Sequence, residues 1–349
     1  MAVTSDSQQA GATPPSPASR RAGGGLGTLK SFLVLREGSI IVVTVITAIY
    51  FSTSAHNFFG TQNFKTLLPY FAPYAILAAG EVFVMICGEI DLSIGSVYLF
   101  SPFLWEKFTS AGIPLIPAII LTLIVCGGIG AINGVAVAVV GISSFVATLG
   151  MLFVLDGVVL VMSHATPINT PGTTVLGGST FEQIFGGGAY SELIWAVGIV
   201  IVLQLVLSFT RWGIYTVAVG GNRLGASEAG IRTRMVLIRN FVMCSSLAAF
   251  VGILEAVRVS TATPDPSGSN DILFQAISAA VIGGTLLQGG AGTVIGALIG
   301  ALFLGILHDG LIIKGVNANY LDLYLGIAIL LAMGINTYVQ RVRTGSGRG

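Results

Sequence analysis

Long apolar segments alternate with short polar connections along most of the chain. Each apolar segment is about 20 residues long, the length of α-helix needed to cross the hydrocarbon core of a bilayer. The pattern predicts an all-α polytopic membrane protein with about ten transmembrane helices. The expected spans are residues 38–55, 66–87, 92–110, 113–140, 144–163, 191–210, 237–259, 272–288, 292–313 and 319–338.

The composition supports this class of protein. Apolar residues make up 54% of the chain and charged residues 9%, whereas a soluble domain has about 25% charged residues. The net charge of +1 gives no indication of a nucleic-acid partner. Cys87, Cys126 and Cys244 lie inside apolar segments without paired spacing. We therefore expect small packing residues there, and neither disulfides nor a metal site.

The basic residues are distributed unevenly between the two sides of the ten-span arrangement. Most fall in three places, namely the N-terminal tail, segment 211–239 and the C-terminus, and all three lie on one side of the arrangement. The positive-inside rule makes that side cytoplasmic. We expect a disordered cytoplasmic tail at 1–37 and a transmembrane domain at 38–340. This domain contains an external loop at 164–190 and a cytoplasmic segment at 211–239. A cytoplasmic C-terminal tail is expected at 341–349.

Residues 88–96, Gly-Glu-Ile-Asp-Leu-Ser-Ile-Gly-Ser, place two carboxylates between two apolar segments. Charged side chains at membrane depth usually face a cavity or a partner. Glycines beside them favour an interruption where backbone groups line a path for a polar solute. We expect a broken helix near Glu89–Gly95, with a short solvated loop between two spans as the alternative.

A protein that moves a solute needs polar side chains inside its spans. Carboxylates, amides and hydroxyls among aromatic rings suit a neutral polyhydroxyl solute. The alternative is interhelical hydrogen bonding that holds the bundle together. The candidate pathway residues are Glu81, Glu89, Asp91, Ser93, Asn133, Phe145, Thr148, Gln275, His308 and Asp309.

The chain lacks the GxxxxGK[ST] loop that cradles nucleotide phosphates, and its His, Cys and carboxylate residues have no metal-ligand spacing. We expect a transport protein rather than an enzyme, with no cofactor or metal bound by this chain. Glycines four residues apart at 130–134 and 292–300 are typical of close helix packing within the subunit or a dimer.

Several motifs, in order along the chain, resemble those of the ribose/xylose-type sugar permeases of bacterial ABC importers. They are residues 88–96, Ser-Phe-Val-Ala-Thr-Leu-Gly-Met at 144–151, Gly-Gly-Asn at 220–222 with Gly230-Ile231, and Ala-Ala-Val-Ile-Gly-Gly-Thr at 279–285 with Gly289-Gly290. The resemblance covers roughly residues 40–340. It implies a homodimeric subunit of the plasma (inner) membrane. Its partners would be a cytoplasmic ABC ATPase, which uses ATP and Mg, and an extracytoplasmic sugar-binding protein.

The resemblance implies that the ATPase contacts a short part of the cytoplasmic segment 211–239. Ser227 and Glu228 stand where the family usually has arginine and leucine, and Gln275 stands where an acidic residue is frequent. An ion-coupled secondary transporter that uses Glu89 or Asp91 is the alternative function, and a channel-like or structural membrane protein is a third. The expected ATPase-coupling residues are Gly220, Gly221, Asn222, Ala226, Glu228, Gly230 and Ile231.

Overall fold

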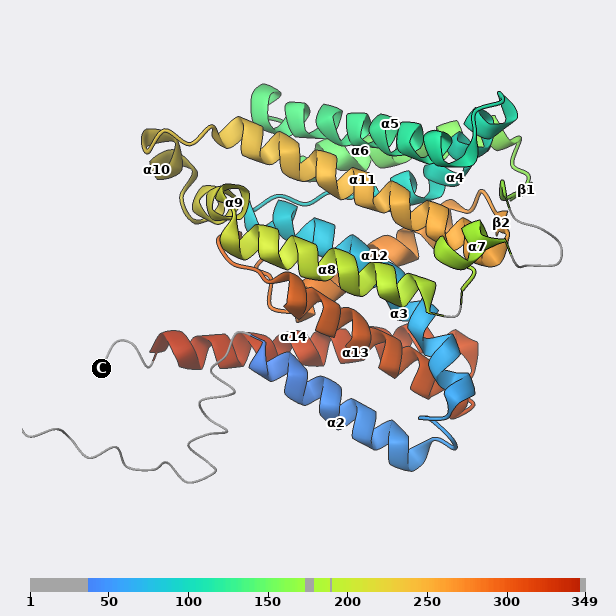
Figure 1. Ribbon diagram of the computed structural model, residues 1–349. Coiled ribbons are helices and arrows are strands. Elements are labelled where there is room, and N and C mark those ends of the chain that lie inside the picture. Colours follow the sequence, from blue (N-terminus) through green and yellow to red (C-terminus); the bar gives the residue numbers. More distant parts are fainter. Residues whose placement is uncertain (1–36, 173–178, 189, 346–349) are drawn as a thin grey trace, which may run out of the picture.

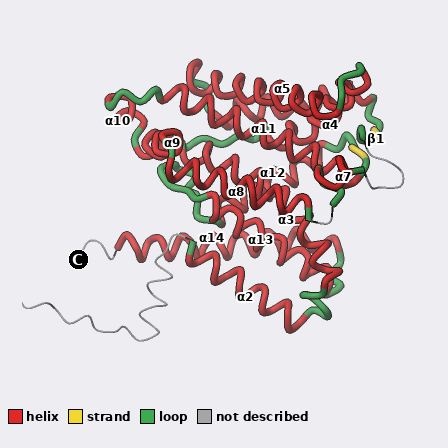
Figure 2. Tube along the Cα trace, viewed as in Figure 1, coloured by secondary structure: helices red, strands yellow, loops and turns green. Residues whose placement is uncertain are grey.

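The computed structural model describes residues 37–172, 179–188 and 190–345 (Figure 1). Within these residues the protein is a bundle of long helices (Figure 2). The tail expected at 1–37 lies outside the described residues except for Glu37. The helices of 17 or more residues are α2 (Gly38–Ser54), α3 (Thr61–Ile86), α4 (Ile94–Ser110), α5 (Leu115–Val135), α6 (Ser144–Ser163), α8 (Ser191–Phe209), α11 (Thr233–Val259), α12 (Pro266–Ile282), α13 (Val294–Ile313) and α14 (Leu321–Gly345).

Six of these helices are long and apolar enough to cross a membrane: α3, α5 with its π-helical continuation (Ala136–Val140), α6, α8, α11 and α13. The helices α2, α4 and α12 have 17 residues each, slightly short of the length that spans about 30 Å of hydrocarbon. The all-α polytopic class is therefore confirmed. The count of ten membrane-crossing helices stays a prediction.

The helix α12 is shifted from its expected span at 272–288 and runs from Pro266 to Ile282. Its start is set by Asp265, whose side chain accepts a hydrogen bond from the Ser267 N–H at 3.0 Å and is followed by a proline at the first helical position. Its end is set by Gly284, whose φ of +95° does not continue a helix. At the C-terminus, α14 extends to Gly345, into the segment expected as a tail.

The expected break is confirmed as a non-helical segment, residues 87–93, between α3 and α4. The Asp91 N–H donates to Glu81 Oε1 at 2.9 Å. Glu81 lies five residues before the end of α3, which is about 7.5 Å along the helix. The chain therefore turns at Gly88, whose φ is +78°, and runs back into the bundle before α4 begins.

The helix α11 packs against α3, α4 and α5. A Cβ on Gly130 of α5 would lie 2.4 Å from the Phe241 carbonyl oxygen of α11, and one on Gly300 of α13 would lie 2.1 Å from the Ala279 carbonyl oxygen of α12. The glycines at four-residue spacing therefore pack helices within one chain. Small residues permit this close approach where no hydrophobic effect drives association.

The two ends of the bundle carry different connections (Figure 1). At one end, β1 (Ile168–Asn169) pairs antiparallel with β2 (Thr261–Ala262), next to α7 (Thr180–Ile184). A 3-10 turn (Ala318–Tyr320) precedes α14. The opposite end carries α9 (Arg211–Gly221) and α10 (Arg223–Glu228).

Substitution of Gly130 by alanine tests the close packing of α5 on α11. The added methyl group would overlap the Phe241 carbonyl, so we expect Gly130→Ala to lower the free energy of unfolding by about 1–3 kcal/mol. The matched control is Gly128→Ala on the same helix, where a Cβ meets nothing within 4 Å. The measurement is the midpoint of thermal unfolding of the purified chain. Equal midpoints for the two variants would contradict the packing.

Candidate functional site

Five candidate pathway residues form a buried polar group around segment 87–93: Glu81, Asp91, Ser93, Asn133 and Thr148, none more than 1% exposed. Ser93 Oγ donates to Asp91 Oδ1 at 2.6 Å and accepts from Asn133 Nδ2 at 2.9 Å. Thr148 Oγ1 accepts from the Leu92 N–H at 3.0 Å. In this conformation the five side chains hold the non-helical segment to α3, α5 and α6. Their contact with a solute stays a prediction.

Two further side chains of α6 belong to the same region. Ser144 Oγ accepts from the Ile90 N–H at 3.3 Å, and Asp156 Oδ1 accepts from Ser96 Oγ at 2.6 Å. Asp156 interrupts the apolar pattern of the span, which is the signal for it in the sequence, whereas Ser144 stands at the first position of the span.

A second group of polar residues joins α3, α12 and α13. The Tyr70 ring stacks on the His308 ring with centroids 4.0 Å apart, and the Tyr70 hydroxyl donates to Gln275 Oε1 at 3.3 Å. Beside it, Asp309 Oδ2 accepts from Asn63 Nδ2 at 2.6 Å. The structure thus brings the candidates Gln275 and His308 together on a tyrosine that was not among the candidates.

Phe145 lies apart from these two groups. Its side chain is 55% exposed near the start of α6, among other exposed apolar residues. In the described residues of a single chain it therefore forms no wall of either polar group.

The expected coupling stretch folds as α9, a sharp turn and α10. The side chain of Asn222 caps α10 by accepting from the Gly225 N–H at 2.9 Å. Ala226 is buried and packs with Ile231 and Leu237, while Glu228 is exposed. The φ of Gly230, +83°, belongs to the left-handed region that favours glycine. About three turns of helix, α9, precede Asn222.

Gly220 and Gly221 differ in their surroundings. A Cβ on Gly220 would lie 1.7 Å from the carbonyl oxygen of Ile86, the last residue of α3, whereas one on Gly221 meets nothing within 4 Å. The same Ile86 carbonyl accepts from the Gly290 N–H at 2.7 Å. The end of α9 is therefore in direct backbone contact with the end of α3, and Gly221 faces open space.

Asn240 of α11 connects the same elements and was not predicted. It is fully buried, it accepts from Trp212 Nε1 of α9 at 2.7 Å, and it donates to the Phe83 carbonyl of α3 at 3.0 Å. Its only sequence signal is a lone amide inside an apolar span.

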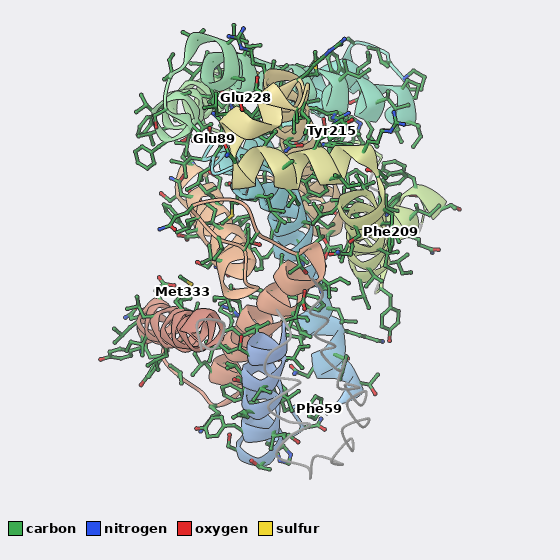
Figure 3. All side chains as sticks on the ribbon, turned by 90° about the vertical axis from the view of Figure 1, so that its left-hand side faces the viewer. Phe59, Glu89, Phe209, Tyr215, Glu228 and Met333 are labelled. Atoms are coloured by element: carbon green, nitrogen blue, oxygen red, sulfur yellow. The ribbon has the colours of Figure 1, made fainter. Side chains whose placement is uncertain are left out.

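Glu89 connects segment 87–93 to α10. Its Oε1 lies 2.6 Å from Nη2 of Arg223, in an ion pair whose glutamate side chain is 14% exposed. Figure 3 shows Glu89 at the same end of the bundle as Glu228 and Tyr215. The candidate Glu89 is thus paired with the coupling stretch rather than directed at the polar groups inside the bundle.

A helical bundle with polar groups inside its spans and a compact two-helix stretch at one end has the architecture of a membrane transport permease. The sequence model of the family described as "Branched-chain amino acid transport system / permease component" matches residues 63–333. The chain belongs to this family.

Relatives with curated names cover nearly the whole chain. They include the xylose/arabinose import permease protein XylH of Sulfolobus acidocaldarius, 34% identical over 87% of this chain and 86% of that protein. The ribose import permease protein RbsC of Escherichia coli K12 is 33% identical over 88% and 95%, and the D-allose transport system permease protein AlsC is 28% identical over 88% and 93%. No solved structure matches the chain.

The resemblance to the sugar permeases of ABC importers is therefore confirmed. The chain is the multi-pass permease subunit of an importer, a transport component rather than an enzyme. Such subunits work with an ABC ATPase and a binding protein.

Charge reversal tests whether the Glu89–Arg223 pair contributes to transport. We expect Glu89→Arg or Arg223→Glu alone to lower the transport rate of the reconstituted importer by about threefold or more, and the double reversal to restore most of it. The control is Arg234→Glu, an exposed arginine close to α10. A double variant that transports no better than the single variants would contradict a role for the pair.

Proposed function

We propose that this importer carries a monosaccharide or related polyol, delivered by an extracytoplasmic sugar-binding protein. The observation that carries the proposal is that near full-length relatives are named as permeases for xylose/arabinose, ribose and allose. The polar groups inside the bundle are consistent with it, because hydroxyls, amides and carboxylates exchange hydrogen bonds with a polyol.

Contact with the sugar falls, in this proposal, on the two polar groups of the bundle. The cluster of Tyr70, Gln275 and His308 offers a hydroxyl, an amide and an imidazole beside stacked rings, a combination typical of small-molecule sites. The group around Asp91 and Ser93 is closed in this conformation. It would meet the solute only if α3, α5 and α6 move apart.

Coupling to ATP hydrolysis falls on α9 and α10. Two copies of this chain would sit on two copies of a cytoplasmic ATPase, with ATP and Mg bound by the ATPase and no cofactor by this chain. The exposed face around Gly221 and Glu228 would contact the ATPase. Movement of α10 would reach segment 87–93 through the Glu89–Arg223 pair, and movement of α9 would reach it through the contact of Gly220 with Ile86.

Affinity purification of the chain from native membranes, with identification of its partners by mass spectrometry, tests the function. We expect recovery of an ABC ATPase, and a binding protein on which sugars can be screened. Recovery of the chain alone, with uptake that collapses on addition of an uncoupler, would contradict the proposal and favour an ion-coupled transporter.

Substitution of Gly221 separates docking from folding. Because a side chain at this position meets open space, we expect Gly221→Leu to insert and to unfold at the wild-type temperature. We expect it to lower ATPase recovery and transport by about tenfold or more, since the leucine stands on the docking face. The control is Ser227→Ala, a small change at an exposed residue of α10. Wild-type transport by Gly221→Leu would exclude this face as the docking surface.

Cysteine labelling tests the proposed orientation, with both termini cytoplasmic. The three native cysteines are buried and give little background. We expect Thr166→Cys, at an exposed position in the connection after α6, to react with a membrane-impermeant maleimide added to intact cells. Ser227→Cys should react only after permeabilisation. The reverse pattern would invert the topology.

A further inference from the structure

A groove of about 560 Å³ lies between α9 and the start of α11. Guanidinium groups from three places line it: Arg211 at the start of α9, Arg232 just before α11, and Arg239 in the second turn of α11. The aromatic residues Trp212 and Tyr215 line it as well, and no Asp or Glu does. The groove is therefore a concave surface of one charge sign.

Contacts of Trp212 hold part of this arrangement in place. The guanidinium carbon of Arg239 lies 4.5 Å from the centre of the Trp212 ring, a cation–π contact. That ring is fixed in turn by its hydrogen bond to the buried Asn240. No ion pair in the described part of the chain involves Arg211, Arg232 or Arg239. Their N–H groups are thus left for an anion.

The surroundings of the groove place it where a membrane span ends. Phe209, the last residue of α8 and two positions before Arg211, is 79% exposed. Ile214 of α9 and Met235 at the groove itself are each 56% exposed. Arginines and aromatic residues beside exposed apolar side chains are typical of the level of the lipid headgroups.

We propose that this groove binds the phosphate headgroup of an anionic phospholipid, with the acyl chains lying along the exposed apolar residues of α8, α9 and α11. Guanidinium groups match phosphate through paired N–H donors. Phe209, Ile214 and Met235 favour a lipid over an acidic segment of a soluble partner, because a soluble partner would leave these side chains uncovered. This site is additional to transport and does not depend on the identity of the solute.

The test uses the purified full-length chain in neutral detergent, without the ATPase. We expect phosphatidylglycerol to raise the midpoint of thermal unfolding by about 2 °C or more above that in the same mole fraction of phosphatidylcholine. Inorganic phosphate at a matched concentration should give no such shift. An equal shift with phosphatidylcholine, or with inorganic phosphate, would overturn the proposal.

Paired variants locate the effect. Arg211→Gln combined with Arg239→Gln should lose at least half of the phosphatidylglycerol shift, while Arg211→Lys combined with Arg239→Lys should give an intermediate shift, because lysine keeps the charge but not the paired N–H donors. The control pair Arg234→Gln and Lys65→Gln removes the same charge at exposed positions outside the groove and should keep the full shift. If the glutamine pair does not fold, the single variant Arg232→Gln replaces it in this experiment, because it changes only the exposed linker before α11.

A full phosphatidylglycerol shift in the glutamine pair would overturn the assignment to this groove. If that pair also no longer recovers an ATPase from membranes, the groove belongs to the protein partner.

Discussion

The structure depends on one constraint, that a non-helical backbone inside a lipid-solvated bundle must find its hydrogen-bond partners within the protein. The N–H groups at the start of segment 87–93 donate to carbonyls of the last turn of α3. Side chains accept from the next three: Ser144 from Ile90, Glu81 from Asp91, and Thr148 from Leu92. Each unsatisfied group would cost several kcal/mol in hydrocarbon. The carboxylates and hydroxyls at this depth are therefore explained by the backbone they stabilise.

The same segment links the interior of the bundle to the stretch at its end. Backbone atoms of Gly220, Ile86 and Gly290 are in contact with no side chain between them, and such close-packed groups move together rather than compress. Neutral hydrogen bonds of the buried Asn240 hold α9 to α3. The ion pair of Glu89 is more exposed and so more easily broken. Because of this difference, α9 is attached firmly to the rest of the bundle and α10 more loosely.

The sequence predicted the helices well because hydrophobic length is nearly sufficient to define a membrane helix, and most expected spans agree with the observed helices to within a few residues. From its glycines and carboxylates it also predicted a break near Glu89–Gly95, which the structure places at residues 87–93. It did not predict the pairing of Glu89 with Arg223, since the two residues lie 134 positions apart and only the packed bundle brings them together. The role of Asn240 was missed for the same reason, because a single amide carries no periodicity.

The carboxylates that suggested an ion-coupled transporter have structural partners in this bundle. Glu89 is paired with an arginine, and Asp91 accepts two hydrogen bonds from Ser93. Glu81 accepts from the Asp91 backbone and from the Cys244 thiol. A coupling carboxylate has to exchange its ion with water on each side in turn, which the fully buried side chains of Glu81 and Asp91 do poorly in this conformation. A permease whose energy comes from ATP hydrolysis in a separate subunit needs no such exchange, so its carboxylates are free to stabilise a stretch of backbone that leaves the helix.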